Sequence, residues 1–346
     1  MLDGRGPLRP GSETRLDTVR QPWLTRYGQR MRAAYVSAVN ADDPLSALEV
    51  GERPEPALPA DDWVTVEVRA SSLNHHDLWS LQGVGLAADR LPMILGCDAA
   101  GTAPDGTEVV VHSVVDRPVA GSPPWSLLSE YFPGTLAERV AVPRANLVPK
   151  PAGLSFVDAA CLPTAWLTAY QMLTTKGRLP DGGSVLVQGA GGGIATAAVV
   201  LANALGARVY ATSRDAGKRD RIAALGATAL EPGARLPERV DVVVETVGEA
   251  TFDHSLKCAT RGGRIVVSGA TSGYLPKVNL RRVFALELEI LGSSMGTREE
   301  LADLVRLCAE RGVRPVVDSR YPFGDVREAF ARLASGDIFG KVVLEH

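Results

Sequence analysis

Cysteine is scarce in this chain of 346 residues, which carries only Cys97, Cys161, Cys258 and Cys308. No two of them form a C-x-x-C pair, so the spacing excludes a zinc knuckle and argues against a disulfide-stapled secreted fold. The sequence therefore predicts a protein of a reducing compartment, the cytoplasm.

Long apolar runs and a basic excess are missing as well. The run over residues 194–205 is shorter than the roughly 18 residues of a membrane span and contains Asn203. A net charge of −3 and a pI near 6.0 lack the positive footprint of a nucleic-acid binder. We therefore expect no membrane and no nucleic-acid partner.

The length predicts two domains, at about 100–200 residues each. Residues 1–30 combine arginines with Gly and Pro and show little apolar periodicity, which indicates a disordered leader or an upstream start codon. After Met31 the pattern favours β-structure. Val64–Val68 alternates with period two and Glu108–Val115 is rich in valine, so both are predicted as strands.

From Ser184 onward, short strands alternate with helices of about ten residues, which predicts a doubly wound parallel sheet and an α/β fold. Near the C-terminus the pattern predicts a helix over Arg298–Arg311 and strands over Leu286–Leu291 and Val313–Val317. Earlier in the chain, Ser155 opens a predicted helix that Pro163 interrupts.

A glycine cluster stands between a predicted strand, residues 184–188, and a predicted helix, residues 194–205. This is the context in which glycines allow a tight turn and let the backbone approach a pyrophosphate at the helix start. We therefore predict a dinucleotide site formed by Gly189, Ala190, Gly191, Gly192, Gly193 and Ile194.

The end of the second strand indicates which dinucleotide binds. An NAD site expects an acidic residue there, whereas this chain has Ser213 and Arg214, with Lys218 one turn later. A hydroxyl and cations suit a 2′-phosphate, so we predict NADPH as the cofactor. The alternative interpretation is a solvated basic helix start.

Several motifs in order resemble the medium-chain dehydrogenase/reductase superfamily. They are Ser72–Trp79 (SLNHHDLW), Ile94–Gly101 (ILGCDAAG), Leu162–Tyr170, Gly189–Ala195, Asp241–Gly248 and Phe339–Leu344. The resemblance implies a catalytic domain with a GroES-like β-barrel over residues 31–165 and 298–346. It also implies a Rossmann NADP(H)-binding domain over residues 166–297.

The same resemblance allows the zinc chemistry of the superfamily to be checked position by position. Asn74 stands where zinc members carry a ligand Cys, Cys97 and Asp98 stand where they carry His and Glu, and Thr164 stands at the third ligand position. This is a poor donor set for a catalytic zinc. We therefore expect no metal and a zinc-independent enzyme.

Without a Lewis acid, the feasible chemistry is hydride transfer from NADPH to an activated conjugated acceptor, namely a quinone, an enone or an enoyl thioester. The resemblance favours this quinone oxidoreductase and enoyl reductase branch. Two alternatives stay open at this point: an NAD(P)-dependent alcohol dehydrogenase with non-standard zinc ligands, and a non-catalytic NADPH-binding sensor.

The resemblance also implies roles for single residues. Asn74, His76 and Asp77 are the predicted catalytic group, with His76 a candidate proton donor and Asp77 an orienting acceptor. Further predicted cofactor contacts are His75, Thr168, Val247, Gly269, Ala270 and Lys341. Each has a structural alternative, such as a turn-stabilising Asn or a half-buried His. Finally, Val278–Met295 holds an apolar strand of the kind that pairs across a two-fold axis, which predicts a homodimer.

Overall fold

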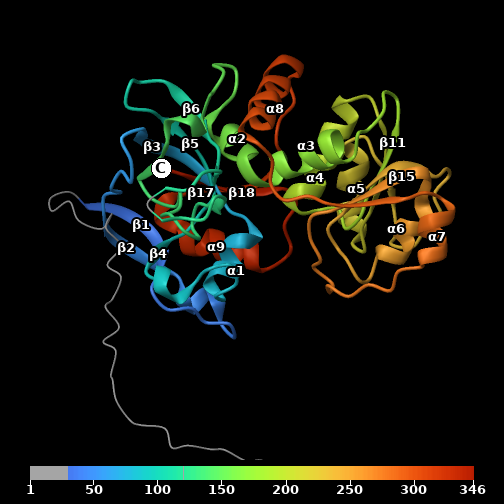
Figure 1. The fold of residues 1–346 in the computed structure, drawn as a ribbon, viewed down its shortest axis with the longest axis horizontal. Helices are drawn as coiled ribbons and strands as arrows, with labels where there is room; N and C mark the ends of the chain where they lie inside the picture. The colour runs from blue at the N-terminus through green and yellow to red at the C-terminus, as the bar shows by residue number, and fades with distance from the viewer. Residues whose placement is uncertain (1–29, 120) are drawn as a thin grey trace, which may run out of the picture.

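The computed structural model describes residues 30–119 and 121–346, and Figure 1 shows two groups of elements side by side along the long axis. The predicted leader, residues 1–30, lies outside the described residues except for Arg30. That residue already begins strand β1 (Arg30–Val36), one position before the predicted domain start. Among the described residues, no helix is long and apolar enough to cross a membrane.

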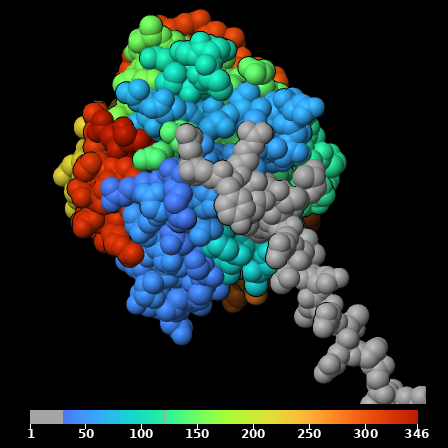
Figure 2. All heavy atoms as spheres, turned by 90° about the vertical axis from the view of Figure 1, so that its left-hand side faces the viewer, coloured from blue at the N-terminus to red at the C-terminus, as the bar shows by residue number. Residues whose placement is uncertain are grey.

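The first group contains a seven-stranded sheet, a three-stranded sheet and a strand pair. Their strands are β1, β2 (Glu49–Pro54), β3 (Trp63–Ser72), β4 (Met93–Ile94), β5 (Asp98–Thr102), β6 (Glu108–Val111), β7 (Val114–Val115), β8 (Ser126–Leu127), β9 (Arg139–Pro143), β10 (Leu147–Pro149), β17 (Val317–Pro322) and β18 (Lys341–Glu345). Strand β18 pairs antiparallel with β3, so the C-terminus completes a sheet that begins near the N-terminus. Figure 2 shows the same neighbourhood from outside, where blue N-terminal and red C-terminal residues adjoin on one face.

The second group is a six-stranded sheet in which every neighbouring pair is parallel, in the order β13-β12-β11-β14-β15-β16. Its strands are β11 (Ser184–Val187), β12 (Arg208–Thr212), β13 (Thr228–Leu230), β14 (Val240–Glu245), β15 (Ala259–Val267) and β16 (Glu289–Gly292). The strand order reverses between β11 and β14, which places a ligand crevice at the carboxyl ends of these two strands. The predicted α/β fold with a GroES-like part and a Rossmann sheet is confirmed.

The helices connect and cover these sheets. They are α1 (His75–Leu81), α2 (Phe156–Ala160), α3 (Leu167–Gln171), α4 (Gly193–Ala204), α5 (Ala216–Ala224), α6 (Phe252–Cys258), α7 (Leu280–Ala285), α8 (Arg298–Arg311) and α9 (Val326–Ala334). Short 3-10 turns cover Pro44–Ala47, Ala88–Arg90, Arg144–Asn146 and Phe323–Asp325, and π-helical turns cover Leu162–Trp166 and Met172–Lys176. In Figure 1, α2 and α3 lie between the two groups.

Two local predictions about helices are confirmed. Pro163 has no N–H to donate, and the helix gives way to a wider π-helical turn over Leu162–Trp166 between α2 and α3. Helix α8 begins and ends as predicted because Thr297 and Glu300 cap it. Thr297 Oγ1 accepts from the Glu300 N–H at 3.1 Å, and Glu300 Oε2 accepts from the Thr297 N–H at 2.8 Å.

Two strand predictions near the C-terminus are wrong in their bounds. Val313–Val317 is not a strand, because Pro315 has no N–H for a ladder, and β17 begins only at Val317. Leu286–Leu291 shrinks to β16, because Leu286 closes the unpredicted helix α7.

The valine-rich segment predicted as one strand over 108–115 is also divided, into β6 and β7. The Asn146 side-chain amide donates to the carbonyls of His112 and Val114 at 2.9 and 2.6 Å. These carbonyls are thereby taken out of a regular ladder, which is why the strand is interrupted.

One buried apolar cluster runs from the first group into the second. It includes Ala100 and Val110 from the first sheet, Trp166 between them, and Val187 and Val266 from the parallel sheet. Close-packed apolar contacts therefore join the two groups of elements.

Candidate active site

The glycine loop follows β11 directly. Gly189 has a φ of 70°, and a Cβ at this position would overlap Val247 Cγ2, so only glycine fits. The loop is tied to the next strand, because the Ala190 N–H donates to the Thr212 carbonyl at 2.7 Å. Gly192 precedes the first residue of α4, so the free N–H groups of this helix start beside the loop.

The other predicted cofactor residues follow neighbouring strands. Ser213 and Arg214 come after β12, Val247 after β14, and Gly269 and Ala270 after β15. Because these strands are parallel, their carboxyl ends lie at the same edge of the sheet, where the fold brings the predicted residues together. Thr168 is buried on α3, which packs against α4, and Ile194 lies in the first turn of α4.

Two lysines approach the glycine loop. The Lys218 Cδ lies 3.1 Å from where a Cβ on Gly191 would be, and Lys341 Cδ lies 2.9 Å from the corresponding point on Gly193. Lys218 also reaches across to the first group, donating to the Gly336 carbonyl at 3.1 Å. Arg214 is exposed and forms no ion pair with any residue of 30–119 or 121–346.

The Lys341 ammonium is buried in a polar network beneath the loop. It donates to the Leu73 carbonyl at 2.8 Å, to Asn74 Oδ1 at 2.6 Å and to Asp98 Oδ2 at 3.0 Å. Lys341 is 2% exposed and Asp98 is 0% exposed. Ser72 and Asn74 also donate to Asp98 Oδ2, at 2.7 and 2.9 Å. All three ammonium protons are therefore used inside the described part of the protein, and its predicted pyrophosphate contact stays a prediction.

Asp77 fixes the beginning of α1. Its carboxylate accepts from the backbone N–H groups of Asn74 at 2.8 Å and Gly96 at 3.0 Å. Burial raises the pKa of Asp77, with the nearby His76 acting in the opposite direction. His75 is exposed at the first position of α1, and desolvation of its ring together with the Lys341 ammonium lowers its pKa.

His76 contacts two residues from distant parts of the chain. His76 Nε2 lies 2.9 Å from Glu130 Oε1, and His76 Nδ1 lies 3.6 Å from Cys97 Sγ. Burial opposes the charged ring, but the Cys97 sulfur, the Glu130 hydrogen bond and the Asp77 carboxylate outweigh it and raise the pKa of His76 to about 11. Burial raises the pKa of the Cys97 thiol, whereas the neighbouring His76 lowers it.

Sequence reasoning missed Glu130. It is 54 residues from His76, in no recognised motif, so no local signal could have shown the contact. The sequence shows Cys97 as a departure from the zinc pattern, but not that its sulfur faces His76.

Zinc donors can now be tested against the geometry. At the positions where zinc members carry ligands, Asn74 and Asp98 already surround the Lys341 ammonium, and a positive charge there disfavours a second cation. A different trio, His76, Asp77 and Cys97, brings donor atoms within 4.8 Å of one another. Both Asp77 oxygens, however, already accept backbone N–H groups, and His76 Nε2 is engaged by Glu130, so the trio is not arranged freely around a metal position. The described residues are therefore a poor donor set for zinc.

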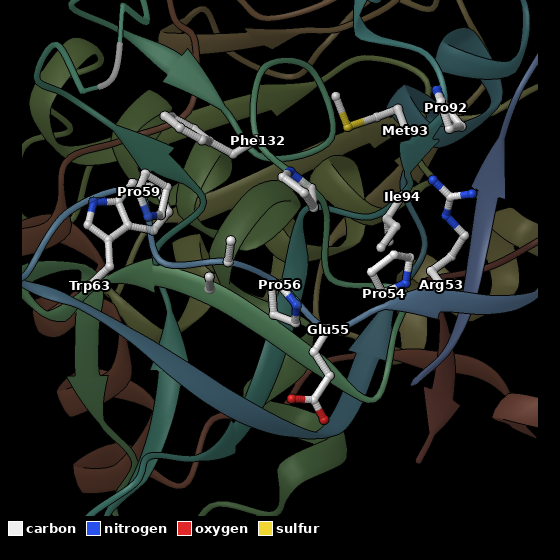
Figure 3. A pocket seen from close by; sticks show the side chains of 13 residues that line it. Arg53, Pro54, Glu55, Pro56, Pro59, Trp63, Pro92, Met93, Ile94 and Phe132 are labelled. Carbon is white, nitrogen blue, oxygen red and sulfur yellow. The ribbon is translucent and has the colours of Figure 1, made fainter. Parts of the chain in front are cut away.

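Two cavities lie away from this network. Figure 3 shows a small one of about 40 Å³ in the first group, lined by Pro54, Pro56, Trp63, Met93 and Phe132. The other, of about 440 Å³, lies against α6 and includes Arg235, Arg239 and Lys257. Neither is lined by a predicted site residue.

Comparison with known proteins agrees with this geometry. Residues 60–152 match the family described as alcohol dehydrogenase GroES-like domain, and residues 219–344 match the family described as zinc-binding dehydrogenase. A solved NAD-dependent alcohol dehydrogenase is 34% identical, with a TM-score of 0.81, and the match covers 91% of this chain and 100% of that one. The chain belongs to the medium-chain dehydrogenase/reductase superfamily.

Other superfamily members similar to the chain act on conjugated thioesters by name. Acryloyl-coenzyme A reductase of Sulfurisphaera tokodaii is 26% identical over 335 residues, which is 90% of this chain and 100% of that protein. A structure of a 2-octenoyl-CoA carboxylase reductase in complex with NADP and 2-octenoyl-CoA is 26% identical, with a TM-score of 0.82. That match covers 92% of this chain and 88% of the other. The superfamily assignment establishes an oxidoreductase with a nicotinamide cofactor and a small-molecule substrate.

Proposed function

We propose that this protein is a zinc-independent, NADPH-dependent reductase of an activated conjugated acceptor, with an enoyl thioester, an enone or a quinone as the substrate class. The observation that carries the proposal is the Lys341 ammonium, held 2.6 Å from Asn74 and 3.0 Å from Asp98 at positions where zinc members bind metal. A fixed positive charge is already built into the site by the chain itself.

The cofactor supplies a hydride donor when bound, and the chain supplies binding and charge. The glycine loop and the start of α4 would hold the diphosphate, and Ser213, Arg214 and Lys218 would hold the 2′-phosphate. The position of Arg214 supports this role, because its guanidinium is exposed and has no carboxylate partner in the described residues.

At the substrate, the chain would stabilise negative charge and supply a proton. Asn74 Oδ1 accepts from Lys341, which fixes the amide so that Nδ2 keeps one N–H beyond the one it donates to Asp98. That N–H, backed by the Lys341 charge, suits a developing oxyanion. His76 is charged at neutral pH and is the group available to donate a proton.

The similarity to an acryloyl-coenzyme A reductase and to an enzyme crystallised with 2-octenoyl-CoA supports a thioester among the three acceptor classes. The test is NADPH oxidation by the purified chain against a panel of short enoyl-CoA thioesters, enones and quinones, before and after chelator treatment. We expect turnover that survives the chelator. If the protein oxidises NADPH with none of these acceptors, the proposed function is wrong.

An NAD(P)-dependent alcohol dehydrogenase is the second candidate, favoured by the similarity to a solved NAD-dependent alcohol dehydrogenase. It predicts alcohol oxidation that requires about one zinc per chain. A non-catalytic sensor predicts NADPH binding without turnover of any acceptor. Metal analysis and cofactor fluorescence on the same preparation separate the three.

We also propose the predicted domain limits, residues 31–165 with 298–346 and residues 166–297, and a homodimer. Strand β16 is the last strand of the parallel sheet, and helix α7, which precedes it in the chain, exposes Leu280 at 69% and Phe284 at 71%. Pairing of this edge with a second copy would cover both. Sedimentation of the wild type and of Leu280→Glu tests the dimer, which the charge should dissociate.

A further inference from the structure

Glu130 is a charged residue that the proposed mechanism does not use, although it forms a direct contact with the candidate proton donor. Its Oε1 lies 2.9 Å from His76 Nε2, and the side chains are 27% and 16% exposed. The bond joins the first turn of α1 to the loop that follows β8. The contact is therefore specific to the folded chain.

The loop that carries Glu130 is held in an unusual conformation. Ser129, which is completely buried, has a φ of 66°, a left-handed conformation that a serine adopts only when its surroundings require it. Its N–H donates to the Phe132 carbonyl at 2.8 Å, and the Cys97 thiol donates to the Leu128 carbonyl at 3.3 Å. These bonds close a tight turn that presents Glu130 to His76.

Gly85 lies next to the Glu130 carboxylate. A Cβ on Gly85 would lie 3.0 Å from Glu130 Oε1, closer than side chains ordinarily pack. The missing side chain at Gly85 therefore leaves the carboxylate its place.

The two nitrogens of His76 face different surroundings. Nε2 meets the Glu130 carboxylate at 2.9 Å, whereas Nδ1 lies 3.6 Å from Cys97 Sγ, within hydrogen-bond distance for a sulfur atom. Cys97 belongs to the same buried cluster as Met295, which follows β16 in the second group. The Nδ1 edge of the ring is thus on the side of the junction between the two groups of elements.

We propose that Glu130 is a positioning residue for His76: its carboxylate keeps a proton on Nε2 and leaves Nδ1 as the atom that gives a proton to the substrate. The proposal rests on the proposed function. Once a hydride has reached the β-carbon of the conjugated acceptor, the His76 Nδ1–H bond breaks and a C–H bond forms at the α-carbon. The imidazole becomes neutral, its Nε2–H still donated to Glu130, and water returns a proton to Nδ1 after the product leaves.

Other charges near the ring bear on the same titration. Asp77 and Cys97 both raise the pKa of His76. The pKa of Asp77 is in turn raised by Asp98 and lowered by Lys341. Of these groups, Asp77 is held by two backbone N–H groups, and Cys97 raises the pKa of His76 together with Glu130. Glu130 is the carboxylate with a direct hydrogen bond to the ring, so its removal should have a distinct effect.

The test combines a spectroscopic and a kinetic readout on the full chain. Side-chain ¹⁵N NMR follows the five histidines, with His76→Gln identifying the His76 signal. In the wild type we expect a protonated Nε2 and a charged ring at pH 8. In Glu130→Gln we expect His76 to titrate at least about one pH unit lower, with Glu130→Asp in between and the exposed Glu310→Gln unchanged.

In the kinetic arm, Glu130→Gln should lower kcat about a hundredfold, at the low end of the range for general acid catalysis, with the NADPH KM unchanged. Its pH–rate profile should shift to lower pH. If the His76 titration and the profile are the same in Glu130→Gln as in the wild type, the positioning role is wrong. If the wild type reduces no acceptor, the proposed function fails, and the NMR titration alone decides the role of Glu130.

Discussion

Lys341 and Arg214 are two cations that the sequence assigns to one cofactor, and the fold gives them opposite surroundings. The Lys341 ammonium is buried and donates all three of its protons to Leu73, Asn74 and Asp98. The Arg214 guanidinium is exposed at the end of β12 and has no acidic partner in residues 30–119 and 121–346. The first cation is therefore part of the folded structure, and the second is available for a ligand.

This difference shows how a charge can serve two purposes in one site. The buried Lys341 ammonium is held by its acceptors, and without it the carboxylate of Asp98 would be buried with no cation beside it. Its main effect is therefore on stability and on the orientation of Asn74. An exposed cation contributes little to stability but can pair with an incoming anion. The following predictions test this division.

Lys341→Met should reduce the free energy of unfolding by about 3–5 kcal/mol, because Asp98 is left charged and buried without a cation. Urea unfolding followed by circular dichroism measures the change. Lys218→Met is the matched control, since that lysine is 20% exposed and should change stability by less than about 0.5 kcal/mol. Equal losses of stability in the two variants would show that burial of the Lys341 ammonium does not set its contribution to stability.

Arg214→Ala should weaken NADPH binding by about 10- to 100-fold, because a charged hydrogen bond contributes about 1.5–3 kcal/mol. NADH, which lacks the 2′-phosphate, should bind as before. Fluorescence titration of both cofactors measures the two affinities, with the exposed Arg327→Ala as control. An equal loss for NADH and NADPH would show that Arg214 does not read the 2′-phosphate.

Ser72→Ala should destabilise the protein by about 1–2 kcal/mol, since Asp98 Oδ2 loses one donor, at 2.7 Å, but keeps Lys341 and Asn74. The neighbouring Ser71→Ala, whose hydroxyl meets His346 instead of a carboxylate, should cost less. Combining Ser72→Ala with Lys341→Met measures their coupling. Strict additivity would mean that the two donors do not share Asp98 as one network.

The last prediction concerns the pH dependence of stability. Folding raises the pKa of His76 from its ordinary value near 6.5 to about 11, so its contribution is complete below pH ~6.5 and declines as the pH rises toward 11. The stability difference between the wild type and His76→Gln should therefore shrink between pH 7 and pH 10. Urea unfolding at several pH values measures it, and a difference that grows with pH would contradict the raised pKa.

Much of the fold was predictable, for physical reasons that differ between elements. Helix α8 has its cap and its apolar pattern within one short segment, so its bounds follow from local sequence. The bounds of strand β17 were predicted wrongly because they depend on its pairing with β18, a strand that follows later in the sequence. The glycine loop was predictable since strand, turn and helix are contiguous, whereas the His76–Glu130 contact joins residues 54 positions apart.

The alternating α/β pattern, the glycine loop, the cationic end of β12 and the substitutions at the positions expected to hold zinc could all be predicted from the amino-acid sequence alone. These features depend on residue type and short spacing. Only the tertiary structure decided that Lys341 turns inward to Asp98 and that Glu130 meets His76. Both contacts bring together side chains from separate elements, and their direction depends on packing and burial that no local pattern encodes.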